Sequence, residues 1–450
     1  MKVVLMKSVV AVMMCLMLAA MLSPVSAIAE EAAAPAPAAT APAPAPKIDT
    51  GDTAWMIVAT AMVMLMSIPG LALFYGGLAK TKDALNTMAM TFVTFCIVSV
   101  LWVMYGYTFS FGDDIRGLIG NASKLFLKGV GPNSISDLAK TIPEYIFIVY
   151  QLTFAAITVA LASGAYIERM KFSAWIIFSV LWMTLVYMPV AHWVWGGGFL
   201  AKLGALDFAG GTVVHINAGI AALVGALILG KRRVKAIIPG NLTLVVTGAG
   251  LLWFGWFGFN AGSALAANGL AGAAFINTNT ATATAALAWL FVEWMHSGKA
   301  TVLGLASGAV GGLVAITPAA GFVNIGGAIF IGIAAGVIPF YAVAKLKPMF
   351  GYDDTLDAFG IHGIGGTIGA LLTGVFADPA INEAGKGLLY GNPGQLWTQF
   401  IAVAVTIVYS GVMTGVIFMV IKAIIGLRVE PEDETVGLDE SQHGERAYNS

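Results

Sequence analysis

The chain has 450 residues, of which 58% are hydrophobic and only 10% are charged, and its mean hydropathy is +0.86. Soluble domains carry about 25% charged residues, so this composition excludes a soluble globular protein and indicates that most of the chain lies in lipid. A net charge of −1 gives no support to a nucleic-acid partner.

Residues 1–27 are predicted to be a signal peptide. Lys2 and Lys7 form a basic start, an apolar core follows, and Val25-Ser26-Ala27 has the small residues of a cleavage site. Ala27-Ile28-Ala29 is a second candidate site, and an uncleaved extra helix is the alternative. An Ala/Pro-rich tether follows over residues 28–50, and its composition favours an extended, unpacked segment.

The rest of the chain reads as an all-α polytopic membrane protein. A span needs roughly 20 apolar residues, and this criterion predicts eleven transmembrane helices within a domain over 51–427, followed by a polar tail over 428–450. The predicted spans cover about 53–79, 86–110, 144–167, 172–195, 209–230, 241–264, 277–296, 300–318, 324–344, 358–377 and 396–426.

The distribution of basic residues predicts the orientation. A cleaved signal leaves the N-terminus outside, and an odd number of spans then places the C-terminus inside. Segments that would be inside hold thirteen Lys or Arg and those outside hold six, which agrees with the positive-inside rule. The thirteen are Lys80, Lys82, Arg169, Lys171, Lys231, Arg232, Arg233, Lys235, Lys299, Lys345, Lys347, Lys422 and Arg428, and the six are Arg116, Lys124, Lys128, Lys140, Lys202 and Lys386.

Two short patterns recur five spans apart. Gly70–Gly77 and Gly255–Gly262 both read Gly-x-x-x-Phe-x-x-Gly, and His215 and His362 each have a glycine four residues later. An offset of five helices reverses the orientation, so the echo predicts two inverted five-helix repeats plus one extra helix. Chance similarity between glycine-rich spans is the alternative.

His215 and His362 are the histidines that lie well inside predicted spans, whereas His192 is expected to anchor at an outer interface. The plain interpretation of a buried histidine is a hydrogen-bonded packing residue, but an intramembrane ionisable residue is a functional hypothesis by default. His215 lies about 12 Å along its helix from Asp207, and His362 lies about 7 Å along its helix from Asp357. The two histidines can therefore meet only if both helices start below the membrane surface. Asp207 and Asp357 stand where carboxylates cap helix N-termini.

Both rings are expected to be neutral, because the positive end of a helix dipole disfavours an imidazolium ion. A pair of this kind could line the path of a small hydrogen-bonding molecule, relay its proton, or hold a haem iron. The sequence has no H-E-x-x-H, no G-x-S-x-G and no cysteine cluster, so we predict no enzyme, cofactor or metal site.

Four motifs together resemble the ammonium transporter family. This family includes the Rhesus proteins, and the motifs fit its bacterial branch better than its Rhesus branch. They are AHWVWGGG (191–198), LDFAGGTVVHINAG (206–219), GWFGFNAGSA (255–264) and DAFGIHGIGG (357–366). The resemblance covers about residues 50–450 and implies a homotrimer in the bacterial inner membrane, with one substrate path through each protomer.

The resemblance also implies roles for single residues. Ammonium would be recruited at an outer aromatic site, lose its proton, and pass as ammonia, with a separate proton relay as an added hypothesis. The residues that bind the substrate would be Trp195, Ser263, Phe154 and Tyr150, and Phe154 and Phe259 would form the gate. His215 and His362 would line the pore, and Asp207 would give electrostatic support. Thr317 is expected near the outer path, and Asp357 is not placed on the path.

The polar tail is expected to dock as a lid on the inner surface, where a PII-type signal protein would bind, and a disordered tail is the alternative. Two further functions stay open at this stage. One is an ammonium sensor that keeps the transporter fold, and the other is an electron carrier with haem between the two histidines.

Overall fold

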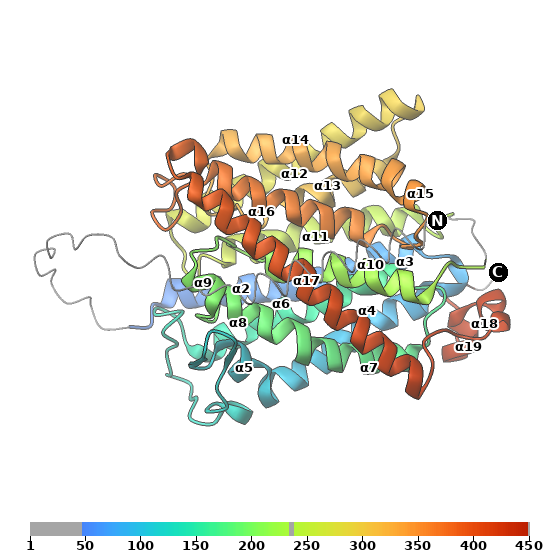
Figure 1. Ribbon diagram of the computed structural model, residues 1–450, viewed down its shortest axis with the longest axis horizontal. Helices are drawn as coiled ribbons and strands as arrows, with labels where there is room; N and C mark the ends of the chain where they lie inside the picture. The colour runs from blue at the N-terminus through green and yellow to red at the C-terminus, as the bar shows by residue number, and fades with distance from the viewer. Residues whose placement is uncertain (1–46, 234–237, 449–450) are drawn as a thin grey trace, which may run out of the picture. The chain divides into compact units, whose positions relative to one another are not determined.

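The computed structural model describes residues 47–233 and 238–448, which form a bundle of helices (Figure 1). Within these residues, nine helical runs are long and apolar enough to cross a membrane. They are Thr50–Leu78, Thr81–Phe111, Glu144–Ala165, Phe172–Lys202, Gly211–Leu229, Leu242–Gly262, Ile325–Phe350, Phe359–Phe376 and Pro393–Ile424. The predicted all-α membrane fold is therefore confirmed.

Several runs contain a π-helical turn, written η here, between two α-helices. The elements of the first half are α2 Thr50–Leu65, η1 Met66–Gly70, α3 Leu71–Leu78, α4 Ala84–Leu101, η3 Trp102–Gly106, α5 Tyr107–Phe111, β1 Asp114–Ile115, β2 Ile119–Gly120, α6 Glu144–Ala162, α7 Phe172–Trp182, η6 Met183–Tyr187, α8 Met188–Val194, α9 Phe199–Lys202, η7 Gly211–Ile216 and α10 Asn217–Leu229. Those of the second half are α11 Leu242–Gly262, α12 Gly269–Ser297, α13 Val302–Ile316, α14 Ile325–Tyr341, η8 Ala342–Leu346, α15 Lys347–Phe350, η9 Phe359–Ile364, α16 Gly365–Phe376, α17 Pro393–Ile424, α18 Pro431–Val436 and α19 Leu438–His443.

The two remaining predicted spans coincide with α12 and α13. α12 is 29 residues long but rich in Asn and Thr, and α13 has only 15 residues. α12 starts at residue 269 rather than 277, because the side chain of Asn268 accepts hydrogen bonds from the N–H groups of Leu270 and Ala271 and so begins the helix there. A total of eleven membrane crossings, like the orientation, stays a prediction.

The predicted signal peptide (1–27) and most of the predicted tether (28–50) lie outside the described residues. The described part begins at Lys47, and Asp49 caps α2 by accepting a hydrogen bond from the N–H of Asp52. The last residue assigned to the tether, Thr50, is thus the first residue of α2.

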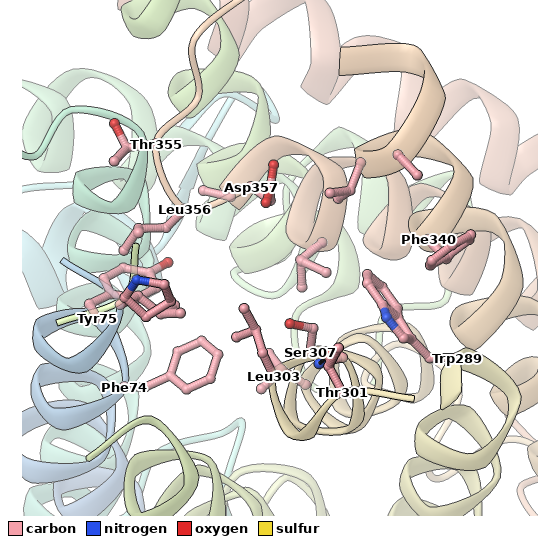
Figure 2. A pocket seen from close by; sticks show the side chains of 18 of the residues that line it. Phe74, Tyr75, Trp289, Thr301, Leu303, Ser307, Phe340, Thr355, Leu356 and Asp357 are labelled. Atoms are coloured by element: carbon pink, nitrogen blue, oxygen red, sulfur yellow. Dashed lines mark hydrogen bonds between the residues drawn. The ribbon is translucent and has the colours of Figure 1, made fainter. Parts of the chain in front are cut away.

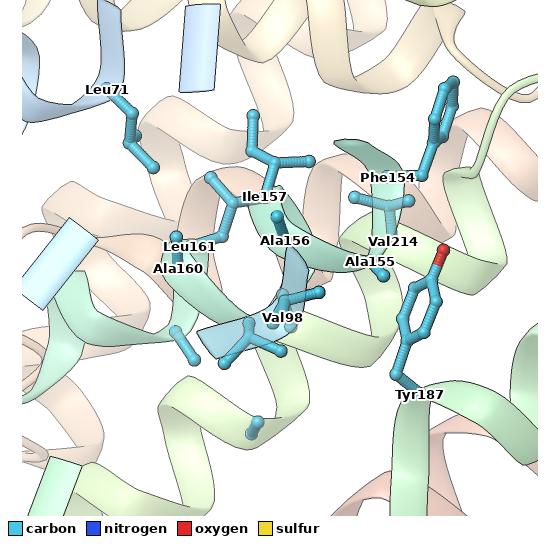
Figure 3. Close-up of a cluster of buried hydrophobic side chains, with 14 of the residues drawn as sticks. Leu71, Val98, Phe154, Ala155, Ala156, Ile157, Ala160, Leu161, Tyr187 and Val214 are labelled. Carbon is cyan, nitrogen blue, oxygen red and sulfur yellow. The ribbon is translucent and has the colours of Figure 1, made fainter. Parts of the chain in front are cut away.

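α6 lies at the centre of the bundle and is buried almost along its whole length. Ala155, Ala156 and Ala160 let neighbouring helices approach, and Figure 3 shows them among larger side chains from other elements. Within lipid the hydrophobic effect does not drive helices together, and small residues allow the close van der Waals packing that does. Phe154, which the sequence assigns to the gate, thus stands on a helix held from all sides.

The tail folds against one end of the bundle, which we call the tail end (Figure 1). The carboxylate of Asp439 accepts from the N–H groups of Leu85 and Asn86 at 3.0 and 2.8 Å, and Asp83 accepts from the N–H of Leu438 at 2.8 Å. These bonds cap the start of α4 and join it to α19. The opposite end carries the segment 112–143 with β1 and β2, and we call it the hairpin end.

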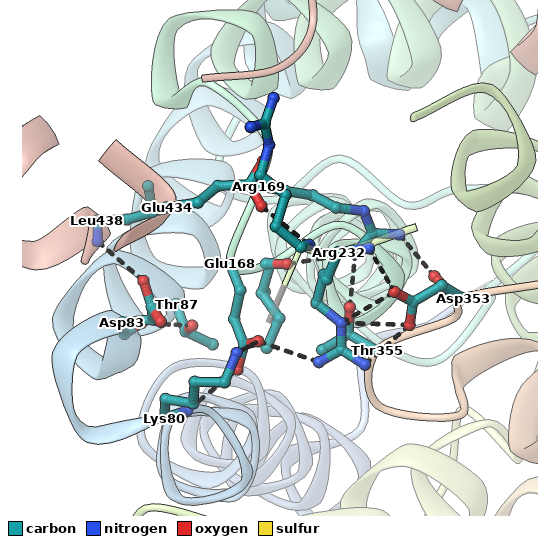
Figure 4. A network of polar contacts seen from close by, with 12 residues as sticks. Lys80, Asp83, Thr87, Glu168, Arg169, Arg232, Asp353, Thr355, Glu434 and Leu438 are labelled. Carbon is teal, nitrogen blue, oxygen red and sulfur yellow. Dashed lines mark hydrogen bonds and ion pairs between the residues drawn. The ribbon is translucent and has the colours of Figure 1, made fainter. Parts of the chain in front are cut away.

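Two buried arginines tie the connecting segments together at the tail end (Figure 4). Arg232 binds Glu168 at 3.0 Å and Asp353 at 2.8 Å. The guanidinium of Arg169 donates to the hydroxyl of Thr355 at 2.7 Å. Burial opposes ionisation of Asp353, but hydrogen bonds from Arg232 hold the pKa of Asp353 down at about 2. The segments that follow α6 and α10 and the segment before η9 are therefore anchored on a common charged cluster.

Candidate functional site

The two intramembrane histidines meet at the centre of the bundle. His215 lies in η7 and His362 in η9, and their Nδ1 atoms are 3.3 Å apart. The rings are nearly parallel, with centroids 5.3 Å apart and an interplanar angle of 20°. In this contact one Nδ1 must donate and the other accept, so at least one ring is neutral. The Nε2 of His215 is buried without a hydrogen-bond partner among the described residues.

The contact is possible because each helix starts inside the protein. The buried carboxylate of Asp207 accepts four backbone N–H groups at the start of η7, which satisfies the free donors of a helix N-terminus. Asp207 therefore supports the helix that carries His215, and it is not among the described residues that line the two cavities next to the histidines and the stacked phenylalanines. The donors are Gly210, Gly211, Thr212 and Val213, at 2.8, 2.6, 2.8 and 3.0 Å.

The carboxylate that caps the second histidine turn is Asp354, not Asp357. Asp354 accepts from the N–H groups of Ala358 and Phe359 at 3.1 and 2.7 Å. Asp357 instead has a φ of 60° and forms an ion pair with Lys347 at 2.6 Å. It also lines a cavity that reaches His362, whereas the sequence analysis places it off the substrate path.

Glycines let the two helices approach closely enough for the rings to touch. A Cβ on Gly219 would lie 2.1 Å from the backbone N of Gly363, and one on Gly366 would lie 3.0 Å from the carbonyl O of Gly211. The glycine four residues after each histidine, noticed in the sequence, therefore marks the crossing of the two helices.

An indole ring covers the face of His215 away from its partner. The rings of Trp256 and His215 are 5.3 Å apart at 20°, and the indole N–H of Trp256 donates to the hydroxyl of Thr317 at 2.8 Å. Thr317 is fully buried. Its contact with Trp256 gives it a structural role, and its predicted place near the outer path stays a prediction.

Phe154 and Phe259 are stacked between the histidines and the hairpin end. Their ring centroids are 4.1 Å apart at 17°, and both rings are buried. The ring of Phe259 is also 6.2 Å from that of His215. The structure thus brings the predicted gate and the predicted histidine pair into one continuous row.

A cavity of about 250 Å³ lies on the hairpin side of the stacked rings. Phe154, Trp195 and Ser263 line it, as do Gln151 and Phe147 from α6. The rings of Phe154 and Trp195 stand nearly perpendicular, at 86° and 5.8 Å. Three of the four predicted substrate-binding residues therefore share one cavity, which we call the hairpin-side cavity.

Tyr150, the fourth predicted substrate-binding residue, does not line this cavity. It is completely buried, and its hydroxyl group donates toward the carbonyls of Phe259 and Gly258, at 2.7 and 3.0 Å. The same hydroxyl lies 3.2 Å from Oγ of Ser263. Tyr150 thus holds the end of α11 that presents Phe259 and Ser263.

A second cavity, of about 320 Å³, lies on the tail side of the histidines (Figure 2). His362 lines it, whereas His215 does not. Its walls are partly aromatic, with Phe74, Tyr75, Trp289 and Phe340, but Asp357 and Glu293 also contribute. We call it the tail-side cavity. The stacked phenylalanines and the histidine pair separate it from the hairpin-side cavity.

The remaining histidine of the sequence analysis is not an interface anchor. The ring of His192 is fully buried, with Nδ1 3.0 Å from the carbonyl of Ser110 and Nε2 2.9 Å from the carboxylate of Asp114. It holds the segment that enters β1 against α8.

The two histidines in contact leave no room for haem. Metal–nitrogen bonds are about 2 Å long, so an iron between two nitrogens needs them about 4 Å apart on opposite sides of a porphyrin. The two Nδ1 atoms are closer than that, and the nearly parallel rings face each other edge to edge through them. In the described residues, no group of three or more His, Cys, Asp or Glu side chains could hold a metal ion.

Comparison with known proteins gives one consistent family. The profile of the Ammonium Transporter Family matches residues 54–448. An ammonium transporter of Aquifex aeolicus is 61% identical over 405 residues, which cover 90% of this chain and 94% of that protein. The crystal structure of Saccharomyces cerevisiae Mep2 superposes with a TM-score of 0.80 at 37% identity, covering 86% of this chain and 88% of that one. A structure described as a sensor Amt protein gives 0.81 at 30% identity, covering 87% and 98%.

Proposed function

This chain belongs to the ammonium transporter family, and from that premise we propose that it captures ammonium in the hairpin-side cavity and conducts ammonia past the histidine pair. The observation that carries this mechanism is the order of the parts. Two cavities end on opposite sides of a barrier made of the stacked phenylalanines and the two histidines in contact.

The hairpin-side cavity suits a small cation. An aromatic face attracts a cation by about 0.5–1 kcal/mol when exposed and by 2 kcal/mol or more when desolvated. Trp195 and Phe154 supply such faces. The hydroxyl group of Ser263 donates to the carbonyl of Phe259 at 2.9 Å, so its oxygen can still accept from an ammonium N–H.

The barrier favours a neutral species. Moving an ion out of water into a medium of low dielectric constant costs of order 20 kcal/mol in the idealised Born limit, and still several kcal/mol after relaxation. Ammonia avoids most of this cost. The unpartnered Nε2 of His215 offers a hydrogen-bonding position to ammonia, and the Nδ1–Nδ1 contact gives the proton that ammonium leaves behind a route between the two rings.

Substrate-driven current in vesicles that contain the pure protein tests the relay. We expect His215→Ala and His362→Ala to reduce the ammonium-dependent current, with potassium as the control cation. Unchanged current in both variants would remove the histidine pair from charge transfer, and potassium flux equal to methylammonium flux would contradict a barrier that favours a neutral species.

Four further features belong to the same proposal. The protein is a homotrimer in the inner membrane, its signal peptide is removed, and its hairpin end faces outward with the tail end in the cytoplasm. A PII-type signal protein binds the tail end and blocks the tail-side cavity. Truncation after Gly426 removes α18 and α19, and we expect it to abolish both this inhibition and coupling between protomers.

A sensing role is the alternative, because one similar structure is described as a sensor Amt protein. The two candidates are separated by uptake of labelled methylammonium into vesicles that contain only this protein. Uptake above that of empty vesicles supports transport, and binding without uptake supports sensing.

A further inference from the structure

One side chain in the hairpin-side cavity is not explained by the roles above. Gln151 lies on α6 on the same face as Phe147 and Phe154, and all three line the cavity. Its side chain is nine-tenths buried, and its Oε1 atom has no hydrogen-bond partner among the described residues. A buried amide without a partner is costly, which points to a ligand that completes it.

The other polar contacts near the cavity are already used. The hydroxyl hydrogens of Tyr150 and Ser263 both point toward the carbonyl of Phe259. The carboxylate of Asp207 is occupied by four backbone donors. The described residues that line the cavity include no charged side chain. As the side chains stand, a cation there finds one side-chain acceptor, the hydroxyl oxygen of Ser263, and it gains a second, the amide oxygen of Gln151, when the buried amide turns over; the other walls offer aromatic faces.

These two kinds of contact recognise different properties of a ligand. Aromatic faces attract the positive charge whatever groups the nitrogen carries, and quaternary ammonium ions bind well to them. Amide and hydroxyl oxygens recognise only N–H groups. An ammonium ion has four N–H groups, methylammonium has three and tetramethylammonium has none.

We propose that Gln151 is a specificity-determining residue of the hairpin-side cavity, where its amide oxygen and Ser263 together bind the N–H groups of an ammonium ion while the aromatic walls bind its charge. Rotation about the last side-chain bond exchanges the amide oxygen with the amide nitrogen at almost no change in shape, so Gln151 can present its oxygen. This inference rests on the proposed function, because it treats the cavity as the substrate's entry site.

The test compares substrates with and without N–H groups in the wild type and in Gln151→Met, which keeps the length of the side chain but removes the acceptor. Uptake of labelled methylammonium into vesicles gives KM and Vmax, and unlabelled ammonium and tetramethylammonium serve as competitors. The matched control is Leu152→Met, a buried neighbour on the same helix that does not line the cavity.

A hydrogen bond to a charged group contributes about a factor of ten or more to binding. We therefore expect Gln151→Met to raise the KM of methylammonium and the inhibition constant of ammonium about tenfold. Vmax and the inhibition constant of tetramethylammonium should stay within about twofold, and Leu152→Met should change none of these values.

Three outcomes would overturn the proposal. The inhibition constants of ammonium and tetramethylammonium could rise together, which would mean that the cavity itself is damaged. Neither could change, which would leave Gln151 without a role. Tetramethylammonium could fail to compete in the wild type, so that the walls do not bind a cation without N–H groups.

Failure of the proposed function gives a different result. If the wild type takes up no methylammonium, the quenching of tryptophan fluorescence in the purified protein by ammonium and by tetramethylammonium measures binding without transport. A selective loss of ammonium binding in Gln151→Met then supports the inference while transport is rejected, and equal binding by both proteins rejects the inference too.

Discussion

The two histidine turns follow one plan and differ in how tightly they are held. In each, a buried aspartate caps a π-helical turn that carries the histidine, and a glycine follows four residues later. Around η7, however, His215 is enclosed by Trp256 and by its partner ring, whereas His362 on η9 opens to the tail-side cavity. The comparison teaches that two helix starts built on the same plan can form one contact in which one histidine is tightly held and the other is open to a cavity.

The largest expected effect comes from the two capping carboxylates. Asp207→Ala leaves four buried N–H groups without an acceptor and Asp354→Ala leaves two. At about 1–3 kcal/mol for each unsatisfied group, the first change should cost well over ~4 kcal/mol and the second about half as much. Thermal unfolding of the purified variants in detergent measures the difference.

The variants Asp207→Asn and Asp354→Asn are the controls, because the asparagine amide keeps one acceptor oxygen at each site. We expect each to fall between the wild type and the alanine variant. Equal destabilisation by Asp207→Ala and Asp354→Ala would contradict the claim that the turn around His215 is the more rigid one.

Substitutions at Gly219 and Gly366 test the same comparison of the two histidine turns, with a smaller expected loss of stability. A methyl group on Gly219 would meet the backbone of Gly363, which cannot move aside, while one on Gly366 would be crowded less severely, at 3.0 Å from the carbonyl O of Gly211 and from the Cβ of His215. Overpacking costs about 1–3 kcal/mol. We expect Gly219→Ala to reach the top of that range and to lower uptake strongly, and Gly366→Ala to stay near the bottom.

Uptake and unfolding midpoints of the two glycine variants should be measured side by side. Gly250→Ala is a suitable control on α11, because a Cβ there has no heavy atom within 4 Å. The interpretation fails if Gly366→Ala is the more harmful of the pair.

Thr317→Val tests the position of Trp256, whose ring packs on His215. Valine keeps the shape of threonine but leaves the buried indole N–H of Trp256 without its acceptor, at a cost of about 1–3 kcal/mol. A tilt of Trp256 changes the stacking on His215, so we expect uptake to fall several-fold while the fluorescence maximum of the protein shifts. Unchanged uptake would show that the orientation of Trp256 does not matter to the path.

Several of these features could be predicted from the sequence because they leave a mark in it. His215 and His362 are rare polar residues in apolar spans, and the glycine four residues after each marks the helix crossing. The sequence does not predict how a helix is rotated about its own axis, and so which side chains face a cavity. Tyr150 and Gln151 are neighbours on α6, and only packing decides that the first is buried and the second lines the cavity.

Gln151 nevertheless gave a readable signal, since it is an amide in the middle of an otherwise apolar run. Nothing in the sequence distinguishes Asp354 from Asp357 as the residue that caps the helix. Either could cap a helix that starts near residue 358, and the outcome depends on the charges that surround each. Lys347 at the start of α15 forms an ion pair with Asp357, which leaves Asp354 to cap the turn.

The smallest expected effect concerns this Lys347–Asp357 pair, which has no counterpart at η7. Both side chains are partly exposed, and such pairs contribute about 0–1 kcal/mol to stability. Asp357→Asn should therefore leave the unfolding midpoint almost unchanged, in contrast to Asp354→Ala three residues earlier. Asp357 lines the tail-side cavity, so its loss leaves the positive charge of Lys347 unpaired next to a wall residue, and we expect ammonium-dependent current toward the hairpin end to fall by less than threefold. Double replacement Lys347→Met with Asp357→Asn removes both charges and should restore that current. If the single variant instead unfolds as readily as Asp354→Ala, the second turn depends on both carboxylates, and the contrast between a tightly held and an open histidine turn is smaller than the structure indicates.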